Sequence, residues 1–136
     1  MSELTAIRQG LADALSTGLG DGYQVSPWLL ASPTYPTVQI MPGEITYHQA
    51  MADGLTFWGF TVRVLLSLSS DIGAQQTLDS LMGENSSGVK AAIEEDPTLG
   101  GVCDDLIVRT VGNYQTYVTA NGGHIIGADW TVEVWR

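Results

Sequence analysis

The segment at residues 57–69 constrains the fold most, because its apolar side chains recur at every second position. These positions hold Trp58, Phe60, Val62, Val64, Leu66 and Leu68, and most of those between carry small or polar residues. Successive side chains of a β-strand point to opposite faces, so this period of two predicts a strand. One face of that strand must be buried under another layer of the domain.

The N-terminal part of the chain follows a helical period instead. Leu4, Ile7, Leu11 and Leu15 are spaced by three or four residues, which places them on one face of a helix. We predict this helix over residues 3–17, with Ser2 as its cap and the glycines from Gly18 onward as its end. The glycine-rich stretch 18–22 follows a helix instead of joining a strand to one, so it is interpreted as a turn and not as a phosphate loop.

Two short strands are predicted next, at residues 25–31 and 37–41, separated by a segment with two prolines. Proline cannot donate a hydrogen bond to a sheet, so these strands are expected at an edge or to end there. Pro42 and Gly43 then open a predicted loop, residues 44–55, which carries Ile45, Tyr47, Met51 and Leu55. A loop of that length is uncommon in a compact domain unless it has a function.

The second half of the chain predicts two helices followed by two long strands. Asp71 can cap a helix whose period includes Gln75, Leu78, Leu81 and Met82 and which ends at Gly83. A shorter helix is predicted over residues 87–95, with Val89, Ala92 and Ile93 inward, and Pro97 prevents its continuation. Strands follow at 106–119, with a bulge or kink at Gly112 and Asn113, and at 126–134 after an Asn-Gly-Gly turn.

This order of elements predicts one α+β domain over residues 1–136, with a largely antiparallel sheet covered by helices. Its charge restricts the partners, because 5 Lys and Arg residues stand against 15 Asp and Glu residues, for a net charge of −10. A nucleic-acid binder of the usual kind needs a basic surface, and an anionic membrane likewise attracts a basic surface. Neither nucleic acid nor an anionic membrane is therefore expected as a binding partner of this acidic chain. The sequence also shows no signal peptide and no apolar run long enough to span a membrane, so no membrane partner is expected.

No residue pattern predicts catalysis, metal binding or a cofactor. The chain has no Gly-x-Ser-x-Gly motif, and Asp104 and Asp105 beside the lone Cys103 would raise the pKa of its thiol, which disfavours a nucleophile. His48 and His124 lie in a predicted loop and after a turn, far apart in sequence. A hydrolase with a pair of carboxylates stays an open alternative, because fifteen acids offer many pairs.

Three consecutive acids, Glu94, Glu95 and Asp96, end the second predicted helix of this half. The helix dipole disfavours anions at that end by a few tenths to about 1 kcal/mol each. Two interpretations stay open: the cluster is a solvated helix end, or it meets a cation of another subunit or protein.

The tryptophans raise a similar question. Trp58 and Trp130 occupy the apolar positions of their strands and are predicted in the core. Trp28 starts an interrupted strand and Trp135 lies on the opposite face from Trp130, so core and interface positions are both open for these two.

Several short segments, spread over nearly the whole chain, resemble segments of the tail terminator (tail-completion) proteins of long-tailed, non-contractile bacteriophages. They are AIRxxLA at 6–12, PTVQI at 36–40, Tyr47, FWGFTVRV at 57–64, AQQTLD at 74–79, VKAAI at 89–93, DPTLGGV at 96–102 and GADWTVEV at 127–134. Related minor tail and neck proteins share much of this pattern.

The resemblance implies a structural virion protein without enzymatic activity, assembled in the host cytoplasm. Such proteins form a ring, here expected to be a homo-hexamer, at the head-proximal end of the tail tube. The ring ends tube polymerisation and offers a surface for head–tail joining, so the implied partners are other copies, the tail tube protein and the head–tail connector. DNA is expected to pass through the lumen without specific binding, along a wall with acids such as Asp104, Asp105, Asp129 or Glu133.

The resemblance supplies no catalytic or ligand motif, so the candidate site is an assembly interface. Its expected members are Trp28, Tyr47, Met51, Leu55, Glu94, Glu95, Asp96 and Trp135. The alternatives are another minor tail or neck protein, or a small-molecule-binding or hydrolytic domain that works as a monomer or dimer. A sealed apolar pocket with converging polar groups would favour the small-molecule-binding or hydrolytic domain.

Overall fold

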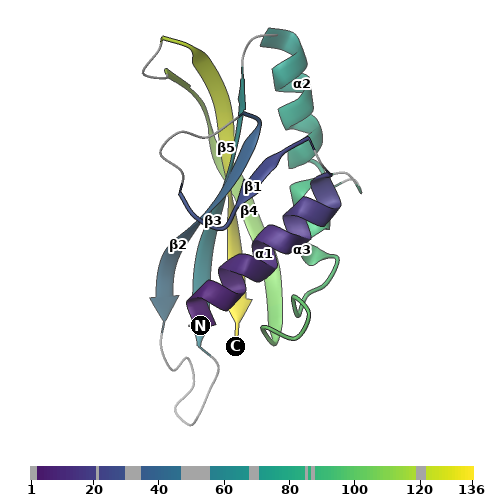
Figure 1. Cartoon of the computed structure of the whole chain (residues 1–136), viewed down its shortest axis with the longest axis vertical. Coiled ribbons are helices and arrows are strands. Elements are labelled where there is room, and N and C mark those ends of the chain that lie inside the picture. The colour runs from purple at the N-terminus through teal and green to yellow at the C-terminus, as the bar shows by residue number, and fades with distance from the viewer. Residues whose placement is uncertain are drawn as a thin grey trace.

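The helices lie on one face of a five-stranded sheet in the computed structural model (Figure 1). The structure describes residues 3–20, 22–29, 35–46, 56–67, 71–84, 86, 88–118 and 122–136. Its elements are α1 (Glu3–Leu19), β1 (Gln24–Ser26), β2 (Thr37–Thr46), β3 (Phe57–Ser67), α2 (Asp71–Met82), α3 (Val89–Glu94), β4 (Asp105–Val118) and β5 (His124–Trp135). This is the predicted order, and the α+β class is confirmed.

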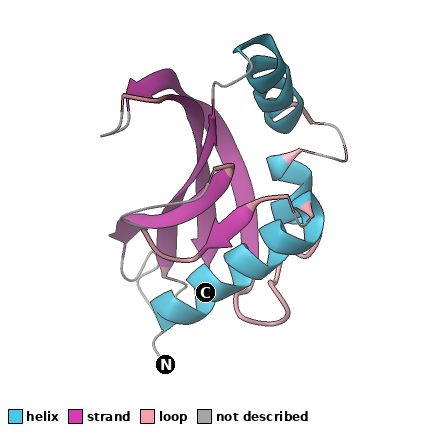
Figure 2. Ribbon diagram, turned by 45° about the horizontal axis from the view of Figure 1, so that its top comes forward, coloured by secondary structure: helices cyan, strands magenta, loops and turns pink. Residues whose placement is uncertain are grey.

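The strands follow the order β1-β2-β3-β5-β4 across the sheet. The pair β1–β2 is parallel, and the other three pairs are antiparallel. The strand predicted from residues 57–69 forms β3, which lies between β2 and β5, with Val62 opposite Ile40 on one side and Trp130 on the other. Figure 2 shows the strands as one curved sheet with the helices along one side of it.

The core lies between the helices and the inward face of the sheet. Ile7, Leu11 and Leu15 of α1 are fully buried, which confirms the predicted helical face. The alternate residues of β3 and β5 meet this layer and are also buried, including Trp58 and Trp130 as predicted. Their neighbours along each strand point to the opposite side, which we call the open face of the sheet.

Two predictions about the first strands are wrong. The strand expected at 25–31 spans only Gln24–Ser26, because the Ser26 hydroxyl bonds both the N–H and the carbonyl of Trp28 and turns the chain. The strand expected to end at Met41 continues to Thr46, and the register shifts between Pro42 and Ile45, so a bulge accommodates the proline that cannot donate. Residues 44–46 of the predicted loop 44–55 therefore belong to β2, and residues 47–55 lie outside the described part of the chain.

The helices differ from prediction mainly at their ends. Helix α1 continues to Leu19, where an added Cβ on Gly18 would lie 2.4 Å from Cβ of Ala92 in α3, so glycine permits the close helix contact. Val89, Ala92 and Ile93 are buried as predicted, but α3 is shorter than the expected 87–95, and Gln75 of α2 is exposed. The bulge predicted at Gly112 and Asn113 is confirmed by a register shift and by φ of 55° at Asn113.

Candidate assembly surfaces

The acidic cluster at the end of α3 contains one residue that the domain itself uses. Glu94 accepts hydrogen bonds from the Lys90 ammonium and, at 2.9 Å, from the main-chain N–H of Val108 on the edge strand β4. Burial opposes ionisation of Glu94, but these two hydrogen bonds outweigh it and hold its pKa below the usual value. A cation of the same chain therefore already neutralises this carboxylate.

Asp96 organises the loop that joins α3 to β4. Its carboxylate accepts hydrogen bonds from the hydroxyl and the N–H of Thr98 and from the N–H of Gly100, at 2.8–3.1 Å. The Thr98 hydroxyl, followed by the two main-chain donors, lowers the pKa of Asp96. This loop places Leu99 in the core, where its Cβ would be 3.1 Å from a Cβ added to Gly10 of α1.

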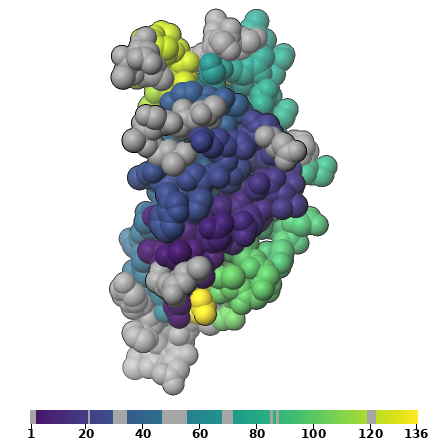
Figure 3. Space-filling model, in the orientation of Figure 1, coloured from purple at the N-terminus to yellow at the C-terminus, as the bar shows by residue number. Residues whose placement is uncertain are grey.

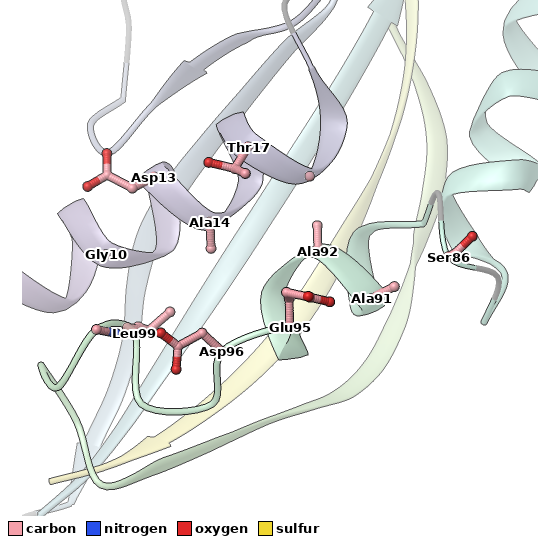
Figure 4. A pocket seen from close by; sticks show the side chains of 12 residues that line it. Gly10, Asp13, Ala14, Thr17, Ser86, Ala91, Ala92, Glu95, Asp96 and Leu99 are labelled. Atoms are coloured by element: carbon pink, nitrogen blue, oxygen red, sulfur yellow. Dashed lines mark hydrogen bonds between the residues drawn. The ribbon is translucent and has the colours of Figure 1, made fainter.

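Glu95 is exposed and lies at the rim of a groove between α1 and α3 (Figure 4). The groove has a volume of about 510 Å³, and Ala14, Ala92 and Leu99 contribute to its apolar lining. Asp13 points away from α3 in this view and accepts a hydrogen bond from Gln9. Figure 3 shows the same region as a surface, with α1 beside the green segment that follows α3. The groove is open, and its carboxylates do not converge on one point.

Trp28 is on the surface and not in the core, since 46% of it is exposed. The guanidinium of Arg8 lies 4.7 Å from the centre of the indole ring and also donates to the carbonyl of Pro27 at 3.3 Å. This cation–π contact fixes the ring against α1 while leaving much of it accessible. An interface role for Trp28 stays a prediction, and a core role is excluded.

Trp135 lies on the opposite face from Trp130, as its position in the strand predicts. Its ring packs edge-on against Phe57 of β3, with 5.7 Å between the ring centres, and it is half-buried. The other predicted interface residues Tyr47, Met51 and Leu55 lie outside the described residues, as does His48.

The open face of the sheet carries two arginine–carboxylate pairs that the sequence analysis did not identify. Arg63 donates from Nε and Nη2 to the two oxygens of Asp129 at 2.8 and 3.0 Å, and the Asn113 amide adds a third hydrogen bond at 2.8 Å. Burial of Asp129 opposes ionisation, but the hydrogen bonds from Arg63 and Asn113 are stronger and lower its pKa. Arg63 and Asp129 are direct neighbours in the β3–β5 register.

Arg109 forms the second pair, with Nε and Nη2 at 3.2 and 2.8 Å from Glu133 Oε1. The register shift between Val108 and Thr110 leaves Arg109 at a bulge on the edge strand. Two acids expected along an acidic lumen, Asp129 and Glu133, are thus each paired with an arginine on the open face. Alternation places all four residues on the outward side of their strands, but only the register brings them together.

Cys103 is buried before β4, and the pKa of its thiol is raised to about 11, first by burial and then by Asp104 and Asp105. The predicted direction is confirmed, with burial as the larger cause. His124 is exposed at the start of β5. Within the described ranges no group of three or more His, Cys, Asp or Glu residues could hold a metal ion. None of the helices described is long and apolar enough to cross a membrane.

No family model and no curated protein matches the chain. Among solved structures, a chain of the virion of a native gene transfer agent particle is similar, with a TM-score of 0.43, 10% identity and coverage of 96% of this chain and 95% of that chain. Another similar chain, described without functional terms, has a TM-score of 0.45, 16% identity and coverage of 95% and 90%. At these values neither neighbour assigns a family or a function.

Proposed function

We propose that this chain is a non-enzymatic structural protein of a phage-like virion, and that it forms the ring that ends the tail tube at its head-proximal end. The proposal takes its starting point from the sequence resemblance to tail terminator proteins. Its partners would be further copies of the chain, the tail tube protein and the head–tail connector.

The observation that carries the proposal is the structural role of residues 96–102 (DPTLGGV). This loop is one of the segments on which the resemblance rests. Asp96 holds this loop with three hydrogen bonds, and Leu99 anchors it under α1. The loop thus serves to fix α1, α3 and β4 relative to one another. A rigid scaffold of this kind suits an assembly protein, whose function depends on the shape of its surfaces.

The charges of the open face are compatible with a channel wall. Arg63 and Arg109 neutralise Asp129 and Glu133, while the chain as a whole carries −10. A wall with paired charges offers DNA no array of free cations, and it avoids the repulsion that fully unpaired acids would create between subunits. In a ring with this face toward the channel, the duplex could pass without binding.

The alternative, a small-molecule-binding or hydrolytic domain, would use the groove between α1 and α3. Asp13, Glu95 and Asp96 are the acids that line this groove, but Asp13 accepts a hydrogen bond from Gln9 and Asp96 holds its own loop. The groove is open, so it lacks the sealed pocket that would favour this function.

Immunogold electron microscopy of phage particles with an antibody against this chain tests the proposed location. We expect label at the junction of head and tail. Cryo-electron microscopy of the same layer should show six-fold or three-fold symmetry. Label elsewhere on the particle, its absence from particles, or another symmetry at that layer would contradict the proposal.

A further inference from the structure

Two stretches of this acidic chain contain no Asp, Glu, Lys or Arg. They are residues 22–43 and residues 110–128, and His124 is the one ionisable imidazole in them. All 15 acids and all 5 basic residues lie elsewhere in the sequence. Charged residues are thus excluded from two long segments rather than spread evenly.

The strand order places described parts of these two stretches at opposite edges of the sheet. Residues 22–43 contain the edge strand β1 and the first part of its neighbour β2, and residues 110–128 contain the outer half of the edge strand β4 (residues 110–118) with the start of its neighbour β5. Within the described sheet, β1 and β4 each have a strand neighbour on one side only. We call them the β1 edge and the β4 edge.

Exposed apolar side chains gather at the same two edges. Trp28 and Leu29 follow β1 and are 46% and 60% exposed, and Tyr114 and Val118 of β4 are 41% and 69% exposed. The remaining large hydrophobic residue exposed in the described part of the chain is Ile72 of α2, at 70%. Apolar exposure therefore coincides with the absence of charge.

Proteins normally protect an edge strand with charged side chains, bulges or a covering element. The inner half of β4, residues 105–109, has such protection, because Glu94 accepts a hydrogen bond from the Val108 N–H and Arg109 lies at a bulge. The outer half has a second register shift between Gly112 and Gln115 but no charged residue of its own. Its β-forming sequence, with Thr, Val and Tyr, is suited to pairing with another strand.

Charged groups of other elements also lie near these edges. Asp79 of α2 is close enough to contribute to the raised pKa of Tyr114, after burial. Arg63 lies 5.8 Å from the Tyr117 ring centre and is paired with Asp129, and Arg8 stacks on Trp28.

We propose that the β4 edge of one copy pairs with the β1 edge of a second copy. Two molecules that each carry −10 repel, so they can come within hydrogen-bond distance most easily where both surfaces lack charge. Because the two edges differ, the contact is head-to-tail and leaves a free edge at each end of a pair, as a closed ring requires. The inference rests on the proposed function only for the ring; the pairing of copies is testable on the isolated chain.

Charge substitutions at the two edges give the first test. Leu29→Lys and Val118→Lys each place a charge at one edge, and this charge would be costly to bury in a contact. Neither substitution should disturb the core, because both residues are mostly exposed. Sedimentation velocity over a range of concentrations should show self-association of the wild type, weakened about tenfold or more in each variant. Ile72→Lys is the matched control, an equally exposed apolar residue on α2, and it should associate like the wild type.

Site-directed cross-linking tests the direction of pairing. In a Cys103→Ala background, a Leu29→Cys chain mixed with a Val118→Cys chain should be joined by a short bismaleimide, whereas neither variant alone should dimerise covalently. Covalent dimers of Val118→Cys alone would show β4–β4 pairing and overturn the head-to-tail contact.

A wild-type chain that stays monomeric at the highest soluble concentration would also overturn the proposal, as would Ile72→Lys weakening association as much as the edge variants. These outcomes are distinct from failure of the proposed function. Antibody label at the head–tail junction together with unaffected association of Leu29→Lys and Val118→Lys would refute the edge pairing alone.

Discussion

The Glu94 carboxylate accepts a hydrogen bond from the Val108 main-chain N–H at 2.9 Å, so the end of α3 covers part of the free edge of β4. This contact changes the interpretation of the acidic cluster. Glu94 and Asp96 have partners within the domain, and Glu95 is the exposed member for which the structure describes no hydrogen bond. Neutralising all three residues together would therefore mix folding with assembly.

Single substitutions separate these effects. Glu94→Gln loses the charged acceptor and its pair with Lys90. Because both side chains of this pair are partly exposed to solvent, we expect about 1 kcal/mol of destabilisation. Glu95→Gln should leave the free energy of unfolding unchanged, as urea denaturation can measure. If the cluster also meets a cation of a partner, Glu95→Gln should reduce head–tail joining. Normal yields of infectious particles from the Glu95→Gln variant would instead show that the cluster is a solvated helix end.

The contact between Gly18 and Ala92 predicts a second pair of substitutions. In Gly18→Ala the new Cβ would lie 2.4 Å from the Ala92 Cβ and 2.9 Å from its Cα, so α1 and α3 must move apart. We expect a loss of about 1–3 kcal/mol, although alanine is the better helix former.

Thermal and urea denaturation measure this loss, and Ala92→Gly in the same chain should restore part of it. Gly22→Ala is the control, because an added Cβ there meets nothing within 4 Å. A Gly18→Ala protein as stable as the wild type would contradict the close packing.

Acid should weaken the domain through the Arg63–Asp129 pair. The folded state lowers the pKa of Asp129, so its contribution to stability is fully present above the ordinary carboxyl pKa of about 3.9 and is lost as the pH falls through the lower folded-state pKa. Asp129→Asn should therefore show a shallower loss of stability below about pH 4 than the wild type.

Asp104→Asn serves as the matched control for this pH series, since Asp104 is exposed and the structure describes no hydrogen bond for its side chain. It should retain the wild-type slope. An unchanged slope in Asp129→Asn would mean that the pair contributes nothing measurable.

Cys103 should react with thiol reagents only when the domain opens. Its pKa of about 11 leaves roughly one thiol in a thousand ionised at pH 8, and burial restricts access as well. Ellman's reagent should therefore modify the native protein slowly and the urea-unfolded protein fast. Rapid reaction of the native chain at pH 8 would contradict the buried position.

Much of this fold could be predicted because its signals are local. The alternation through β3 and β5 and the helical spacing of Ile7, Leu11 and Leu15 depend only on the geometry of one element, and each gave the correct element and buried face. The errors lie where a single residue decides an end, as at Ser26, whose hydroxyl stops β1, and at Pro42, which a bulge accommodates.

The surfaces depended on tertiary structure. Sequence alternation places Arg63 and Asp129 on outward positions, but they are 66 residues apart, and only the β3–β5 register makes them a pair. The sequence likewise contains two uncharged stretches, and only the strand order puts β1 from one of them and the outer half of β4 from the other at opposite edges of one sheet. Local periodicity is set by the backbone geometry of each element, whereas register and strand order are set by how distant elements bury their apolar faces together.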